Sequence, residues 1–155
     1  MTEGDNFALG SQEGPDVGIP LRDQKWLRLA MRLYVAPKKE KSYLKITSSN
    51  YQYQLDREEK GNRWIFRYEY FRSAPNNKHP AAHLHVNGTL AHDPLPKKKT
   101  LARVHFPTGR VSIESVIRLL HFHFAVPCNE AESIWRPVLE QTESAFLEIA
   151  HKPRP

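Results

Sequence analysis

The sequence has 155 residues, 39% of them hydrophobic, and a formal net charge of +6. This length suffices for one domain with its own core, and the single cysteine, Cys128, excludes a disulfide framework and a Cys-x-x-Cys zinc or redox pair. No stretch approaches the roughly 18 apolar residues of a membrane span, and the N-terminus lacks the pattern of a secretory signal. We therefore expect a cytoplasmic protein with no membrane partner.

The first 20 residues are rich in Gly, Asp, Glu, Ser and Pro and lack apolar periodicity, which predicts a disordered acidic leader over 1–20. Residues 1–18 hold four acids and no Lys or Arg. The rest of the chain therefore has 23 basic and 13 acidic residues, a formal charge of +10. Such a charge favours polyanions, with nucleic acid as the first class of partner and acidic protein surfaces as the second.

The remaining residues, 21–155, are predicted to form a single domain that begins with strands. Alternation of apolar and polar residues is typical of half-buried strands. The clearest signal is a hairpin, in which Tyr51–Leu55 is followed by Arg63–Phe71. Trp64, Phe66 and Tyr68 should share one face of its second arm. The predicted strands, all between residues 25 and 106, are 26–35, 42–47, 51–55, 63–71, 82–87 and 101–106.

The period then changes from two to that of a helix. We predict helices over 112–125 and 129–151, with Ser112 and Asn129 as N-caps, and we expect Pro137 to kink the second helix or mark its start. Strands first and helices last indicate an α+β fold. The prediction is an antiparallel sheet of about five to six strands with the two C-terminal helices packed on one face.

His83 and His85 are the candidate catalytic pair, because they lie two residues apart in a predicted strand and so share a face. Their neighbours Ala82, Leu84 and Val86 are apolar enough to form the core side. We therefore expect both histidines to point outward. His105 joins them if the strand over 101–106 lies beside this one.

Three interpretations of the histidines stay open. As general acid and base they would serve metal-independent cleavage of a phosphodiester. With His105 they would supply the three protein ligands of a catalytic zinc. In the third interpretation they are surface histidines with no chemical role. Because the sequence has no His-Glu-x-x-His helix and no ligand pair at a diagnostic spacing, we expect neither a metal nor another cofactor.

Cations near this strand are the candidate phosphate ligands. Tyr68 and Tyr70 would stack on bases if exposed, but their place beside Trp64 and Phe66 favours core packing. The predicted substrate-binding residues are Arg67, Lys78, Lys97, Lys98, Lys99, Arg103 and His105.

The order of motifs over Tyr51–Phe124 resembles the TumE family of toxin-antitoxin toxins. The matching segments are Tyr51-Gln52-Tyr53-Gln54-Leu55, Arg67-Tyr68-Glu69, His83-Leu84-His85, His105-Phe106 and the helix from Ser112 to Phe124. The sequence departs from that family's pattern at Asn76-Asn77-Lys78-His79-Pro80 and in its second C-terminal helix. The resemblance implies a cytosolic protein that acts on RNA, or on another component of translation, and is neutralised by an antitoxin partner.

The sequence leaves two hypotheses for function. The first is a toxin-antitoxin or defence-type protein that acts on RNA rather than DNA, as a histidine-dependent endoribonuclease using His83 and His85. The alternative is a non-catalytic basic module that binds nucleic acid or a partner protein.

Overall fold

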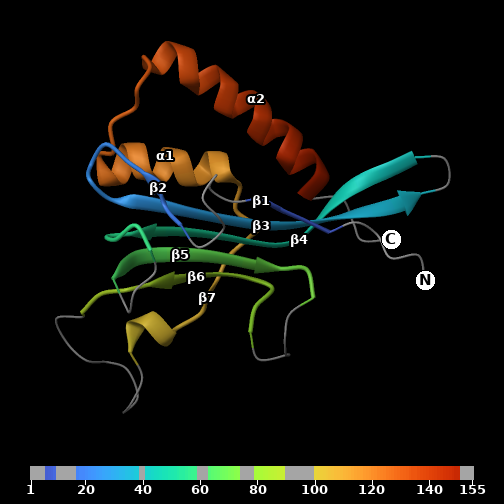
Figure 1. Cartoon of the computed structure of the whole chain (residues 1–155), viewed down its shortest axis with the longest axis horizontal. Coiled ribbons are helices and arrows are strands. Elements are labelled where there is room, and N and C mark those ends of the chain that lie inside the picture. The colour runs from blue at the N-terminus through green and yellow to red at the C-terminus, as the bar shows by residue number, and fades with distance from the viewer. Residues whose placement is uncertain are drawn as a thin grey trace. The chain divides into compact units, whose positions relative to one another are not determined.

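The computed structural model describes residues 6–9, 17–38, 41–58, 63–73, 79–89 and 100–150. The chain divides into two compact units, 1–109 and 110–155, whereas the sequence predicted one domain over 21–155. The first unit holds the sheet and the second holds the two helices (Figure 1). The α+β class is therefore confirmed, while the packing of the helices on one face of the sheet stays a prediction.

The described strands form one antiparallel sheet in the order β1-β3-β4-β5-β6-β7, with β2 paired to β3 as well. The elements of this unit are β1 (Asn6–Leu9), β2 (Ile19–Pro20), β3 (Trp26–Lys38), β4 (Lys41–Gln54), β5 (Trp64–Phe71), β6 (Ala82–Val86), the 3₁₀ helix η1 (Leu101–Arg103) and β7 (Phe106–Pro107).

Several predicted strands differ from those observed. The leader is not wholly disordered, since β1 and β2 lie within residues 1–20 and both pair with β3. The predicted strands 42–47 and 51–55 are joined in one long strand, β4, which ends at Gln54 and leaves Leu55 outside. The predicted strand over 101–106 is wrong, because η1 occupies its first half and the two-residue strand β7 follows.

Residues 51–55 and 63–71 do form the predicted hairpin of β4 and β5, with Tyr51 opposite Tyr68. The register shifts beside Tyr53, so that Tyr53 faces Phe66 while Gln54 faces Trp64. Ile65 is therefore the extra residue of a β-bulge, and Trp64 passes to the opposite face from Phe66. The prediction that Trp64 shares a face with Phe66 and Tyr68 is wrong for this reason.

One face of the sheet is an aromatic core, which we call the aromatic face. The side chains of Leu27, Tyr51, Tyr53 and Phe66 are buried there. The rings of Tyr53 and Phe66 lie 5.6 Å apart between centroids, a tilted contact typical of packed aromatic pairs. These neighbours come from β3, β4 and β5, so this face joins the three long central strands.

In the second unit, α1 (Ile113–Phe124) precedes α2 (Glu132–Ala150). Ser112 is the N-cap of α1, as predicted, and its hydroxyl accepts a hydrogen bond from the Ser115 backbone N–H. Asn129 lies three residues before α2, so it does not cap that helix, and Pro137 lies inside it rather than at its start. Neither α1 nor α2, the helices of the described residues, combines the length and apolar character of a membrane span.

Candidate metal centre

The face of the sheet opposite the aromatic core is buried and polar, and we call it the polar face. Its members occupy facing positions on three strands, with Gln52 opposite Arg67 and Arg67 opposite His85. Glu69 is likewise opposite His83. Because side chains alternate along a strand, these residues all project to the same side.

His83 and His85 do not point outward as predicted. They are 2% and 3% exposed, whereas Ala82, Leu84 and Val86 are only half-buried. Segments before β6 and before β7 supply the backbone carbonyls that contact the two rings. The apolar neighbours in β6 therefore led to a wrong prediction of which side of the strand is buried. A histidine side chain can be buried wherever both of its ring nitrogens have hydrogen-bond partners.

Each of the two histidines has one ring nitrogen tied to a backbone carbonyl. Nδ1 of His83 lies 2.9 Å from the carbonyl oxygen of Pro80, and Nδ1 of His85 lies 3.1 Å from that of Ala102. A carbonyl only accepts, so both Nδ1 atoms carry a proton and donate it. In the neutral tautomer this leaves the lone pair of each imidazole on Nε2.

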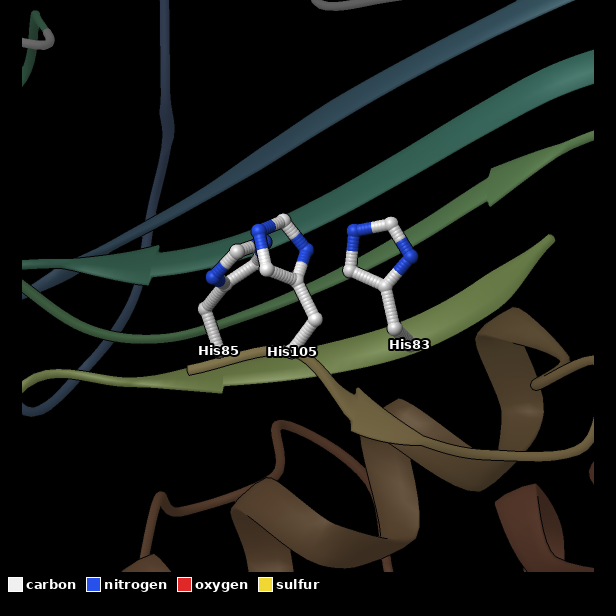
Figure 2. Close-up of side chains that lie close together, drawn as sticks. All are labelled: His83, His85 and His105. Atoms are coloured by element: carbon white, nitrogen blue, oxygen red, sulfur yellow. The ribbon is translucent and has the colours of Figure 1, made fainter. Parts of the chain in front are cut away.

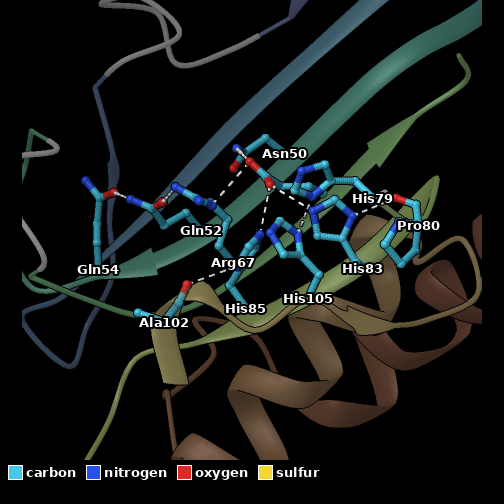
Figure 3. Close-up of polar contacts among 11 residues, drawn as sticks. Asn50, Gln52, Gln54, Arg67, His79, Pro80, His83, His85, Ala102 and His105 are labelled. Carbon is cyan, nitrogen blue, oxygen red and sulfur yellow. Dashed lines mark hydrogen bonds and ion pairs between the residues drawn. The ribbon is translucent and has the colours of Figure 1, made fainter. Parts of the chain in front are cut away.

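Both Nε2 atoms are directed at the same oxygen. Oε2 of Glu69 lies 3.1 Å from Nε2 of His83 and 3.2 Å from Nε2 of His85 (Figure 3). The other carboxylate oxygen, Oε1, accepts a hydrogen bond from Nδ2 of Asn50 at 3.3 Å and lies 3.2 Å from Nε of Arg67. The Glu69 carboxylate is thus held on one side and presented to two imidazoles on the other.

His105 completes the cluster, as the sequence allowed. β7 pairs with β6, with Pro107 opposite His83, and this pairing brings His105 over the two strand histidines. Figure 2 shows the three imidazole rings gathered side by side. One ring nitrogen from each of His83, His85 and His105 lies within 4.8 Å of the others. Nδ1 of His105 also lies 3.3 Å from Nδ1 of His79.

The electrostatics favour neutral imidazoles in this cluster. Burial lowers the pKa of His85, although the nearby Glu69 carboxylate opposes the shift. Burial and the neighbouring histidines lower the pKa of His105 to about 4. At pH 7 these two rings therefore offer lone pairs, which is the form that binds a metal ion.

The two contacts of Glu69 have spacings that neighbouring ligands of one metal ion would also have. Two ligands bonded to one ion at about 2.1 Å stand roughly 3.0 Å apart in an octahedral site and about 3.4 Å apart in a tetrahedral one. The two Nε2 to Oε2 distances, 3.1 and 3.2 Å, fall within that span. Nδ1 of each strand histidine bonds to a backbone carbonyl, an outer contact that typically orients a metal-bound imidazole.

A network of polar side chains continues from Glu69 along the polar face. Nη1 of Arg67 donates to Oε1 of Gln52 at 3.5 Å, and Nε2 of Gln52 donates to Oε1 of Gln54 at 2.7 Å. The Arg67 guanidinium also lies over the Trp64 ring, 5.2 Å from its centroid. Arg67 therefore contacts Glu69, Gln52 and Trp64. Its role in binding a substrate stays a prediction.

Of the predicted phosphate ligands other than Arg67 and His105, Arg103 is the one within the described residues. Arg103 lies in η1 with an exposed side chain, not on a strand beside His105. Lys78, Lys97, Lys98 and Lys99 lie outside the described residues.

Glu69 is the member of the site that sequence reasoning missed. Glu69 lies in β5 among aromatic residues and shares a face of the strand with Arg67. An acidic residue at such a position is the one feature of the sequence that could have indicated its role. Its pairing with His83 depends on strand order and register, which the sequence does not display.

A scan against protein-family models finds no match for this chain. Searches of curated proteins and of solved structures find no match either. The function is therefore argued from the residues and their geometry.

Proposed function

We propose that this chain is a metalloprotein that holds a divalent transition-metal ion with His83, His85, Glu69 and His105. The observation that carries this proposal is the convergence of two Nε2 lone pairs on one carboxylate oxygen. Without an ion, the same contacts require two imidazolium groups around the ionised Glu69 carboxylate, next to Arg67. Burial opposes that charging, as the lowered pKa of His85 indicates.

Three imidazoles and one carboxylate are ligands for Zn²⁺, Fe²⁺, Co²⁺ or Ni²⁺ rather than for Mg²⁺ or Ca²⁺, which prefer oxygen. Where a coordination position beside these four ligands stays open to water, such an ion would lower the pKa of the bound water and make it a nucleophile near neutral pH. We therefore propose metal-dependent hydrolysis as the reaction class. This replaces acid-base catalysis by His83 and His85 themselves, since both rings are buried and all four of their nitrogens have partners.

RNA is the proposed substrate. Its support is the charge of +10 outside the first 18 residues and the TumE resemblance. In the reaction, the oxygen of a water molecule bonds to phosphorus, the bond from phosphorus to one ester oxygen breaks, and a proton from the water ends on that oxygen. A toxin or defence role then predicts growth arrest on expression and a protein partner that prevents it.

The ion can be tested directly with Co²⁺, whose visible absorption reports its coordination. We expect one Co²⁺ per chain, with Glu69→Gln and His105→Gln each weakening binding beyond the roughly 10–100-fold typical of outer contacts. His123→Gln is the matched control, because His123 is exposed on α1. Absence of stoichiometric binding, or equal affinity in all variants, would leave the cluster as a buried hydrogen-bond network.

The activity is tested separately with single-stranded RNA. Cleavage should appear with protein loaded with Zn²⁺ or Co²⁺, vanish with chelator, and vanish in Glu69→Gln. Tight metal binding without cleavage would favour the alternative, a non-catalytic basic module.

A further inference from the structure

A groove lies on the sheet beside the histidine cluster. It has a volume of about 420 Å³ and runs over β3, β4 and the end of β5. This volume falls within the range of small-ligand sites, roughly 300–1,000 Å³. Ser48 and Phe71 line it from facing positions, and Phe71 is two residues beyond Glu69 on the same alternation of β5. The groove therefore belongs to the polar face.

Three cations line the groove: Arg32 from β3, Lys45 from β4, and Arg72, which follows β5. No acidic side chain is among the described residues that line it. Within the described part of the chain, no carboxylate forms an ion pair with any of the three. Among the described residues these three cations thus have no carboxylate partner, and such a group of positive charges favours an anionic ligand.

A β-bulge shapes this group of cations. Arg32 pairs with Ser48, whereas Leu33 pairs with Ile46, so Thr47 is the extra residue. The Thr47 hydroxyl donates to the backbone carbonyl of Arg32 at 3.2 Å, and Nε of Arg72 donates to that of Ile46 at 3.1 Å. The second bond fixes Arg72 at the bulge and so orients its guanidinium toward the groove.

Two aromatic side chains, Tyr34 and Phe71, complete the lining. Phe71 also stacks on His83, with ring centroids 6.5 Å apart and planes at 28°. One ring therefore separates the groove from the histidine cluster. Open grooves that combine cations with aromatic rings are typical of sites for single-stranded nucleic acid, since cations take the phosphates and the rings stack on bases.

The geometry points to this groove as the binding site for single-stranded RNA, with phosphates on Arg32, Lys45 and Arg72 and a base against Tyr34 or Phe71. The assignment of RNA rests on the proposed function. An RNA strand in the groove would pass next to Phe71, whose ring stacks on His83.

The test measures binding of a fluorescent single-stranded oligoribonucleotide to metal-free protein in the presence of chelator. We compare the native chain with Arg32→Gln plus Lys45→Gln. The matched control is Arg22→Gln plus Arg63→Gln, which changes the net charge equally but alters no lining residue of the groove. Urea midpoints verify that all three proteins are folded.

We expect the groove variant to bind RNA at least tenfold more weakly than the control. The slope of log K against log salt should fall by about 1.4, since each lost contact to a single strand contributes roughly 0.7. Tyr34→Leu should weaken binding by at least about fivefold. Equal affinity of groove variant and control, or tighter binding of duplex DNA or of inorganic phosphate than of the oligoribonucleotide, would overturn the assignment.

Co²⁺ binding separates this inference from the proposed metal centre. The groove variant should bind Co²⁺ as the native chain does. The metal-free Glu69→Gln protein should bind RNA with the affinity of the metal-free native chain. Loss of RNA binding together with intact Co²⁺ binding supports the groove. RNA binding unaffected by the groove changes contradicts it, whatever the metal result.

Discussion

The two faces of the sheet each hold buried side chains but are stabilised differently. The aromatic face is held by packing, as in the contact of Tyr53 with Phe66. The polar face is held by directed contacts around Glu69, which meets His83, His85, Asn50 and Arg67. Packing needs only shape and volume, whereas buried charges need every partner in place. The polar face is therefore the part of the sheet whose stability should depend on a bound ion.

Phe66→Ala should have the largest effect, because it removes a buried ring from the centre of the aromatic face. We expect a loss of about 3–5 kcal/mol in the free energy of unfolding. Urea denaturation measures it, with and without Zn²⁺. The same loss under both conditions is expected, since Phe66 has no part in the metal centre. A loss that depended on Zn²⁺ would show that the two faces are not separate.

Zn²⁺ should stabilise the native chain through the polar face alone. At a free concentration of 100 times Kd, an ion that binds only the folded state adds about 2.7 kcal/mol. Urea denaturation over a series of Zn²⁺ concentrations should show this gain in the native chain and in Phe66→Ala. It should be absent in Glu69→Gln, and an equal gain in Glu69→Gln would exclude the carboxylate as a ligand.

Asn50→Ala should weaken the metal centre without removing a ligand. Its amide donates to Oε1 of Glu69 and so orients the carboxylate. Loss of such an outer contact typically costs 10–100-fold in metal affinity. Ser49→Ala is the control, since Ser49 directly precedes Asn50 in β4 and its buried side chain lies on the aromatic side. Competition with a chelator measures the metal affinity of both variants, and only that of Asn50→Ala should fall.

The smallest expected effect is a pH dependence of the free energy of unfolding, caused by Asp23 at the edge of the aromatic face. Burial raises the pKa of Asp23, but hydrogen bonds from the Tyr53 hydroxyl and from Lys25 outweigh it and lower the pKa below 3.8. The carboxylate therefore stabilises the fold fully above pH 3.8, and this contribution is lost as the pH falls through the folded-state pKa.

Asp23→Asn should remove this component. The urea midpoint of the native chain should decline more steeply between pH 4 and pH 2 than that of Asp23→Asn. Parallel curves for the two proteins would assign the acid sensitivity to other carboxylates.

Much of the fold follows from local patterns, and its irregularities do not. The alternation in residues 51–55 and 63–71 predicts β4 and β5, and the serine before Ile113 predicts the start of α1. The bulges at Thr47 and Ile65 depend on how two strands pair. The position of Trp64 on the polar face, which follows from the bulge at Ile65, was therefore not predictable. The strand expected over 101–106 failed because η1 forms there and Phe106 begins a strand of only two residues.

The candidate site was half predictable. The residues His83, His85 and His105 were identified, since histidines at alternate positions of a strand share a face. Their burial was not predicted, because the partners that make it acceptable, Glu69, Pro80 and Ala102, lie on other segments. Hydrophobic neighbours indicate the core side only when the opposite side is exposed, and here both sides are covered.

The register of β6 against β5 would give the proposed metal centre a role in folding. Side chains alternate, so a slip of one residue would turn His83 and His85 toward the aromatic side and leave Leu84 facing Glu69. A chain with that mispairing has no site for an ion, whereas the correctly paired chain gains stability when an ion binds. Metal in the surroundings of the folding chain would then select one pairing of these two strands over its neighbours.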